Sequence, residues 1–252
     1  MILPYCWQHP FYLIIFGTNE QGGLLVKRTY FTVFLVGIWT AGVIYAVFTV
    51  VPPAEGLGEL VRIAFFHIPV AWVSVLAFLL SAGWALQYLR TRNLKYDWYS
   101  SAAAGLGLVF CILATVSGAI FAKLTWGAYW NWDPRQTSIF VLLLIYGAYQ
   151  ALRSAIAGPE QQARIAAVYS LLSFITVPFL VFIIPRYYFS LHPSPVINSA
   201  ASVDMDRIML QVLGAALIAC TAIFWLALTR QVRARRRKEK LFATGLKEDV
   251  CQ

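Results

Sequence analysis

Six long apolar segments constrain the fold of this chain more than any other feature. They cover about residues 30–51, 67–89, 102–124, 134–152, 163–184 and 208–228. At ~1.5 Å per residue, helices of this length cross a hydrocarbon core of ~30 Å. A composition of 60% hydrophobic and 12% charged residues excludes an ordinary soluble domain. The sequence therefore predicts an all-α membrane protein, a bundle of six transmembrane helices.

The distribution of Lys and Arg predicts how the bundle is oriented. With six spans, both chain ends share a side with the links after the second and fourth spans, and this side holds 15 of the 20 basic residues. The positive-inside rule then places both termini in the cytoplasm and the other links on the outer face. We expect an interfacial leader over 1–29, a six-span domain over 30–229 and a basic cytoplasmic tail over 230–252.

The outer links contain two further signals. After Pro52-Pro53, apolar residues recur at helical spacing from Leu57 to Phe65 beside polar ones, which predicts a short interfacial helix. Pro178 predicts a kink in the fifth span. The four cysteines are too scattered for a zinc site or a redox pair, and no Cys-x-x-Cys-His motif is present for covalent haem attachment.

The link after the third span is rich in tryptophan and tyrosine. Such residues commonly form an aromatic belt at the membrane interface, and Asp133-Pro134 is typical of a helix start. The same flat rings with polar edges also suit a flat, amphipathic ligand. The stretch runs Trp126-Gly-Ala-Tyr129-Trp130-Asn-Trp132-Asp133-Pro-Arg135-Gln-Thr137.

Two of the three histidines fall on the same face as this aromatic stretch. His67 opens the second span and His192 lies in the link after the fifth. A single interfacial histidine is commonly only a polar tip in the headgroup layer. Two imidazoles beside an aromatic surface instead suit axial ligation of haem iron, whereas zinc requires three or four ligands. The candidate cations for the haem propionates are Arg62, Lys123, Arg135 and Arg186.

These residues resemble the tryptophan-rich haem-handling family of cytochrome c biogenesis, and its C component, CcmC, most closely. The resemblance covers about residues 30–229. It rests on the stretch from Trp126 to Thr137 and on two histidine motifs, Phe66-His67-Ile-Pro-Val-Ala-Trp72 and Leu191-His192-Pro193. Before His192 the chain has Arg186-Tyr-Tyr-Phe-Ser-Leu, which departs from the Trp-Trp-Asn-Thr-Leu pattern of many members.

The resemblance implies a function and a set of partners. The family binds haem b transiently and non-covalently at the periplasmic face of the bacterial inner membrane, and passes it to a CcmE-like haem chaperone. His67 and His192 match the axial ligands. CcmA- and CcmB-like ABC transporter subunits and a small CcmD-like subunit complete the complex. This chain has no phosphate-binding Gly-x-x-x-x-Gly-Lys-[Ser/Thr] loop, and we expect no enzymatic activity of its own. The positions matched to haem presentation and chaperone contact are Trp126, Tyr129, Trp130, Trp132, Asp133 and Arg135.

Three alternatives belong to other classes of protein. The larger haem-delivery ligase of the other c-type maturation system shares the tryptophan signature but is longer than these 252 residues. A membrane b-type cytochrome would carry histidines within its spans, and spans three to six contain none. A plain transporter would show polar residues at the bilayer midplane or broken helices.

Overall fold

The computed structural model describes residues 23–191 and 205–243, and this part of the chain contains six helices long and apolar enough to cross a membrane. The prediction of a six-helix membrane protein is confirmed. The spanning helices are α1 (Gly23–Thr49), α2 (Ala64–Thr91), α3 (Leu94–Trp126), α4 (Pro134–Ala155), α5 (Pro159–Pro178) with its continuation, and α7 (Arg207–Ala243). The shorter elements are the 3-10 helix η2 (Glu59–Ile63), the π-helix η3 (Phe179–Ile183) and α6 (Ile184–Tyr187).

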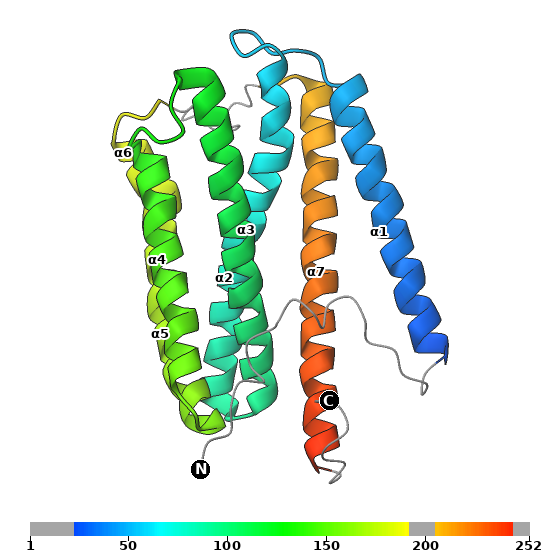
Figure 1. The fold of residues 1–252 in the computed structure, drawn as a ribbon, viewed down its shortest axis with the longest axis vertical. Coiled ribbons are helices and arrows are strands. Elements are labelled where there is room, and N and C mark those ends of the chain that lie inside the picture. The colour runs from blue at the N-terminus through cyan, green and yellow to red at the C-terminus, as the bar shows by residue number, and fades with distance from the viewer. Residues whose placement is uncertain (1–22, 192–204, 244–252) are drawn as a thin grey trace.

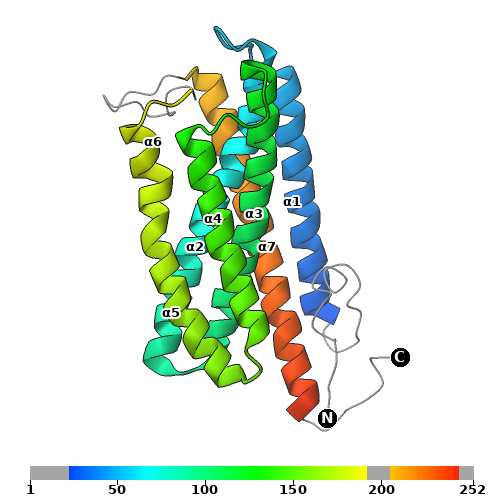
Figure 2. The same cartoon turned by 60° about the vertical axis from the view of Figure 1, so that its left-hand side comes forward.

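The helices pack around a central pair, α2 and α3 (Figures 1 and 2). On one side lie α4 and α5, and on the other α7, which also contacts α1. One apolar cluster lies among α2, α3 and α7 around Phe110 and Phe224, and another lies among α2 to α5 around Phe78 and Tyr146. Smaller clusters join α1 and η2 to α7 and the C-terminal part of α2 to α5. The helix α1 is peripheral, and the indole nitrogen of Trp39 donates to the carbonyl of Ala215 on α7 at 3.1 Å.

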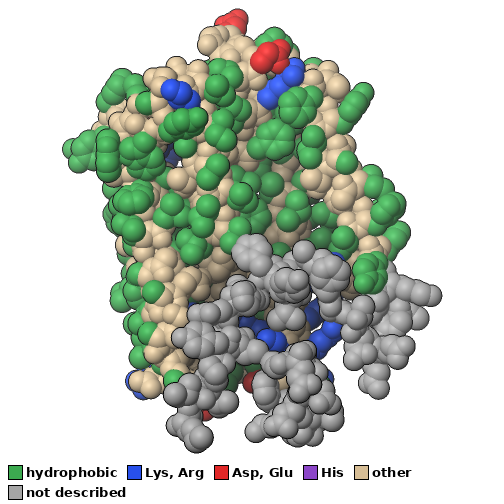
Figure 3. All heavy atoms as spheres, in the orientation of Figure 1, with side chains coloured by type: hydrophobic (Ala, Val, Ile, Leu, Met, Phe, Trp, Pro, Cys, Tyr) green, Lys and Arg blue, Asp and Glu red, His purple; other side chains and the backbone are tan. Residues whose placement is uncertain are grey.

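Apolar side chains cover the flanks of the bundle, and charged ones gather at its two ends (Figure 3). Such flanks suit a hydrocarbon solvent. The upper end in Figure 1 holds η2, the tryptophan stretch and α6, and we name it the signature end. The lower end holds the turns after α2 and α4 and the last turns of α7, and we name it the basic end.

Several helix limits differ from the sequence-based ones. The second spanning helix begins at Ala64, directly after η2, so that His67 lies in its first turn rather than at its start. At the other end of the chain, α7 continues without a break past residue 230 to Ala243, because the basic tail residues are good helix formers. The proposed leader lies mostly outside the described residues.

The fifth span changes its helical type at Pro178. Proline has no N–H to donate, so the α-helical bond pattern cannot continue unchanged there. The α-helix ends at Pro178, a five-residue π-helix follows, and α6 begins directly afterwards with Pro185 in its first turn. The wider turn of η3 lies at the signature end, where π-helical segments often accompany functional sites.

Polar contacts in and near the buried Asp97–Arg153 pair join four helices at the basic end. Asp97 on α3 accepts two hydrogen bonds from the guanidinium of Arg153 on α4, at 2.6 and 2.8 Å. The Gln162 amide on α5 accepts from Arg153 at 3.2 Å and donates to the Arg153 carbonyl at 2.6 Å. Arg235 on α7 donates to Ser101 on α3. These hydrogen bonds and the ion pair therefore hold α3, α4, α5 and α7 in place at the basic end.

Candidate ligand pocket at the signature end

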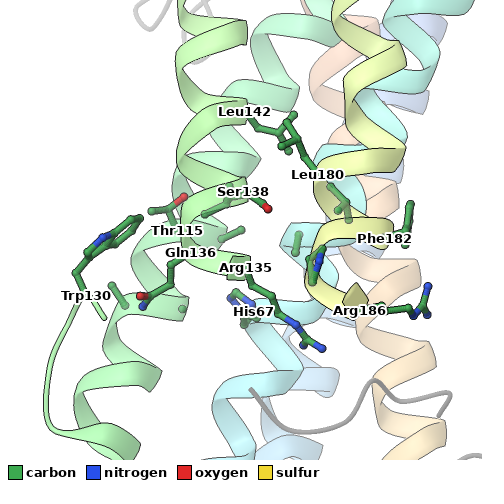
Figure 4. Close-up of a pocket in the computed structure, with 17 residues that line it drawn as sticks. His67, Thr115, Trp130, Arg135, Gln136, Ser138, Leu142, Leu180, Phe182 and Arg186 are labelled. Carbon is green, nitrogen blue, oxygen red and sulfur yellow. The ribbon is translucent and has the colours of Figure 1, made fainter. Parts of the chain in front are cut away.

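A pocket of about 320 Å³ lies between α2, α3, α4 and the η3–α6 segment. Figure 4 shows His67 and Arg135 close together at the edge of the pocket nearest the signature end, with Leu142 and Leu180 at the opposite edge. The pocket is thus polar at one end and apolar at the other, and the described residues that line it include no acidic side chain. Such a gradient suits an elongated amphipathic ligand with anionic groups at one end.

His67 is held by α3. Its Nδ1 lies 3.0 Å from the Ser117 hydroxyl oxygen. That hydroxyl lies 2.8 Å from the carbonyl of Leu113 and 3.1 Å from that of Ala114, so its single proton is directed to the helix backbone. We therefore assign Nδ1–H as the donor to Ser117, which leaves the lone pair of the imidazole on Nε2. This is the tautomer that a metal-ligating histidine with a second hydrogen-bond partner adopts.

Gly118 makes room for the imidazole. A Cβ atom at this position would lie 3.0 Å from Cε1 of His67, closer than an ordinary van der Waals contact. Any larger residue would push the ring out of its present position. Glycine here allows α2 and α3 to approach with the histidine between them.

Two of the four candidate cations line the pocket, and the other two do not. Arg135 and Arg186 line the pocket. Arg62 instead forms a salt bridge with Glu59 at 2.8 Å and lies over the ring of Phe48. Lys123 lies outside the pocket lining.

The Lys123 ammonium donates to the carbonyl of Gly127 at 2.8 Å and lies 5.7 Å from the centre of the Tyr129 ring. Gly127 has φ +83°, which ends α3 in the left-handed conformation that glycine adopts without strain. In this structure Lys123 therefore contacts the C-terminus of α3.

The tryptophan stretch is held by a residue that the sequence analysis left unassigned. The buried Gln136 side chain accepts from the N–H of Asn131 at 2.8 Å and donates to the carbonyl of Tyr129 at 3.2 Å. Trp130 is half-buried, lines the pocket and packs edge-on against Trp132. One amide side chain thus fixes the loop that presents the aromatic rings.

The remaining aromatic residues differ in exposure. Trp126 packs edge-on against Phe121 near the end of α3. Tyr129 and Trp132 are 60% and 71% exposed. Trp132 also has φ +54°, a backbone conformation that is rare for a bulky residue, and its carbonyl accepts from Thr137. Strained backbone under an exposed aromatic ring is a frequent property of functional sites.

Asp133 is buried and caps α4, as the sequence predicted for its backbone role. Its carboxylate accepts from the N–H of Arg135 at 2.9 Å. It also accepts from the Ser190 hydroxyl at 3.0 and 2.9 Å and from the N–H of Leu191 at 2.7 Å. The cap thus joins the start of α4 to the chain that follows α6. The second predicted ligand, His192, lies outside the described residues.

Sequence reasoning missed Ser117, Gly118, Gln136 and Ser190. Each acts by contact with a residue distant in the chain or by lacking a side chain, and none belongs to a residue type that signals chemistry by itself. Of the positions that were proposed, the structure brings His67, Trp130, Arg135 and Arg186 to one pocket.

Comparison with known proteins gives a consistent result. Residues 20–244 match the family model CcmC, described as "Heme exporter protein C". A protein of that name from Bradyrhizobium diazoefficiens is 34% identical over 73% of this chain and 71% of its own length. A putative ccmC-like mitochondrial protein of cytochrome c biosynthesis from Marchantia polymorpha is 29% identical over 77% and 82%. A cytochrome c biogenesis protein CcsA from Cuscuta reflexa matches 37% of this chain and 30% of its own, at 32% identity.

Proposed function

Because this chain belongs to the CcmC family of haem exporter proteins, we propose that it binds haem at the signature end, between His67 and His192, and passes it to a haem chaperone during cytochrome c biogenesis. In this proposal both termini are cytoplasmic and the signature end faces the periplasm. Haem is cargo that binds transiently and without a covalent bond.

The observation that carries the proposal is the state of His67 in the pocket. Ser117 occupies Nδ1, so the free lone pair on Nε2 is available to iron. The ring lies at the polar edge of a pocket whose other edge is apolar. A macrocycle with vinyl groups at one edge and propionates at the other matches that gradient.

The distribution of charge around the pocket supports one orientation of the haem. Arg135 and Arg186 line the pocket, and guanidinium groups bind carboxylates through paired hydrogen bonds. The propionates would therefore lie toward the signature end and the vinyl edge toward Leu142. Arg62 and Lys123, engaged with Glu59 and Gly127, play no part in this arrangement.

The exposed rings of the tryptophan stretch provide a surface for the chaperone. Tyr129 and Trp132 project from a loop that Gln136 fixes, and rigid exposed aromatic residues are common at protein interfaces. Release driven by ATP would belong to CcmA- and CcmB-like partners. We assign this chain the presentation of haem and no chemical step.

The experiment is an absorption spectrum of the purified protein titrated with haem. The wild type should give a low-spin spectrum with two nitrogen ligands. His67→Ala and His192→Ala should each retain some haem with an altered spectrum, and added imidazole should restore the low-spin form by occupying the vacant position. The double variant should lose most of its haem.

His9→Ala serves as the matched control, because His9 is predicted to lie on the opposite side of the membrane from the site. It should bind haem like the wild type. A double His67→Ala, His192→Ala variant with a wild-type spectrum would show that iron is held elsewhere.

A further inference from the structure

The two arginines of the pocket come from different parts of the chain. Arg135 lies in the first turn of α4, and Arg186 lies in the four-residue helix α6 (Figure 4). Their guanidinium groups are close enough to repel each other. Like charges on separate elements move apart unless other contacts join those elements. Contacts outside the pocket must therefore keep α6 beside the start of α4.

Asp133 supplies such contacts. Its carboxylate accepts the capping bond from the N–H of Arg135 at 2.9 Å. The same carboxylate accepts from the Ser190 hydroxyl at 3.0 and 2.9 Å and from the N–H of Leu191 at 2.7 Å, both in the chain that follows α6. Since Asp133 is only 4% exposed, these bonds form away from bulk water, where a charged acceptor binds its donors strongly.

The helix α6 has one attachment on each side of Arg186. On the first side it continues directly from η3, and Pro185 is buried against the protein. On the second side the side chains are mostly in the open, with Tyr187 82% and Phe189 88% exposed. Packing therefore fixes the beginning of α6, whereas the bonds to Asp133 hold the chain after it.

We propose that Asp133 is a positioning residue for the two arginines of the pocket: by joining the start of α4 to the chain after α6, it holds Arg135 and Arg186 together as a clamp for a ligand with two carboxylates. The inference rests on the proposed function and adds that the site selects haem by its pair of propionates. The charge of Asp133 also attracts the Arg135 guanidinium, which offsets the repulsion from Arg186.

One variant weakens the joint without removing the helix cap. Ser190→Ala deletes the hydroxyl donor and leaves the bond between Asp133 and the N–H of Arg135. Hydrogen exchange of the Leu191 amide, measured without haem, should become about fivefold faster as the joint opens more often. The matched control is Ser154→Ala, because the Ser154 hydroxyl donates within its own helix, to the carbonyl of Ala151 at 2.8 Å. Its Leu191 exchange should equal that of the wild type.

The binding experiment compares haem with its dimethyl ester, in which both carboxylates are blocked. The full-length wild type should bind haem about tenfold more tightly than the ester, since only free carboxylates form charge-assisted bonds with guanidinium groups. Ser190→Ala should lose about fivefold in affinity for haem, in line with a weakened set of such bonds, and nothing for the ester. Ser154→Ala should match the wild type with both ligands.

A double variant provides the decisive test. In an Arg186→Ala background the clamp already lacks one arginine, so adding Ser190→Ala should weaken haem binding no further. The same loss in that background, or an equal loss for haem and ester in Ser190→Ala alone, would show that the joint acts on the whole pocket and would overturn the inference. Unchanged haem affinity in Ser190→Ala, with or without faster exchange, would overturn it too.

The wild type separates this inference from the function on which it rests. A low-spin haem complex together with equal affinity for haem and ester would end the inference and leave the proposed function standing. A wild type that binds neither ligand would remove both.

Discussion

Each end of the bundle buries one aspartate next to an end of α4, but the two are used differently. At the basic end, Asp97 is 6% exposed and forms a two-bond ion pair with Arg153. At the signature end, Asp133 is 4% exposed, and the donors that the described residues supply to it are two backbone N–H groups and a hydroxyl. The ion pair joins helices. The other carboxylate joins a helix to a loop.

The contacts of Asp97 suit a role in stability, whereas those of Asp133 suit a role in ligand binding. A buried charge is costly to expose without its partner, so the Asp97–Arg153 pair and its neighbour Gln162 hold α3, α4 and α5 in one arrangement. Bonds from a hydroxyl and a backbone amide hold a loop more weakly, and they lie beside a pocket of about 320 Å³. We therefore expect replacements at the basic end to change unfolding and those at the signature end to change haem binding.

The largest effect is expected at the basic end. Arg153→Ala leaves Asp97 charged and buried without its partner, which should lower the free energy of unfolding by about 3–5 kcal/mol. Denaturant unfolding in detergent micelles measures this. Arg164→Ala, at an exposed arginine on α5, is the control and should change little.

A second variant tests the reason for that loss. Asp97→Asn combined with Arg153→Met leaves no unpaired charge and should recover part of the stability. A loss below about 1 kcal/mol in Arg153→Ala would mean that packing, and not the ion pair, locks this end.

The next largest effect is expected when an arginine that lines the pocket is compared with one that does not. Arg135→Ala should weaken haem binding about 10- to 100-fold, since a hydrogen bond to a charged group contributes about 1.5–3 kcal/mol. Arg62→Ala should change it less than about threefold, because Arg62 pairs with Glu59 outside the pocket. A haem titration followed by absorbance compares them. Equal losses would place the propionates elsewhere.

A smaller effect is expected in the tryptophan stretch. Gln136→Ala removes the acceptor of the Asn131 N–H, and the exchange of that amide should become about fivefold faster, as for the loss of ~1 kcal/mol. Hydrogen exchange with mass spectrometry over residues 126–133 detects the change. Gln150→Ala on the same helix is the control, because the Gln150 amide nitrogen has no hydrogen-bond partner among the described residues. Unchanged exchange in Gln136→Ala would mean that other contacts hold the loop.

The smallest effect is expected at Gly118. The added Cβ of Gly118→Ala would displace the His67 ring by a few tenths of an ångström and should weaken haem binding about two- to fivefold. Stability should not fall, because alanine favours the helix by ~1 kcal/mol over glycine. Gly147→Ala, whose Cβ would meet nothing within 4 Å, should keep full binding. A loss of stability without a loss of binding would contradict the role given to Gly118.

Much of the fold was predictable because its signals are local. Apolar runs define the six spans, and Asp133-Pro134 defines the start of α4. The sequence also named His67, Trp130 and Arg135, which the structure brings to one pocket. Whether His192 completes the site stays a prediction.

The pairing between distant residues could not be predicted. Helices such as α2 and α3 are apolar on all sides, so no polar face shows which side chains meet. Asp97 and Arg153 are 56 residues apart, and His67 and Ser117 are 50 apart. For the same reason the sequence could not separate Arg135 from Arg62, because the direction of each side chain depends on the rotation of its helix.

The backbone of Trp132 has a consequence for how this sequence could be changed. Its φ of +54° places a large side chain where glycine or asparagine would cost less, by about 1 kcal/mol, and the ring is 71% exposed and so adds little to the core. Selection for folding alone would replace it. A redesign that optimises stability would therefore replace this tryptophan at an early step. The resulting protein would be more stable but would lack one of the exposed aromatic rings proposed to contact a partner.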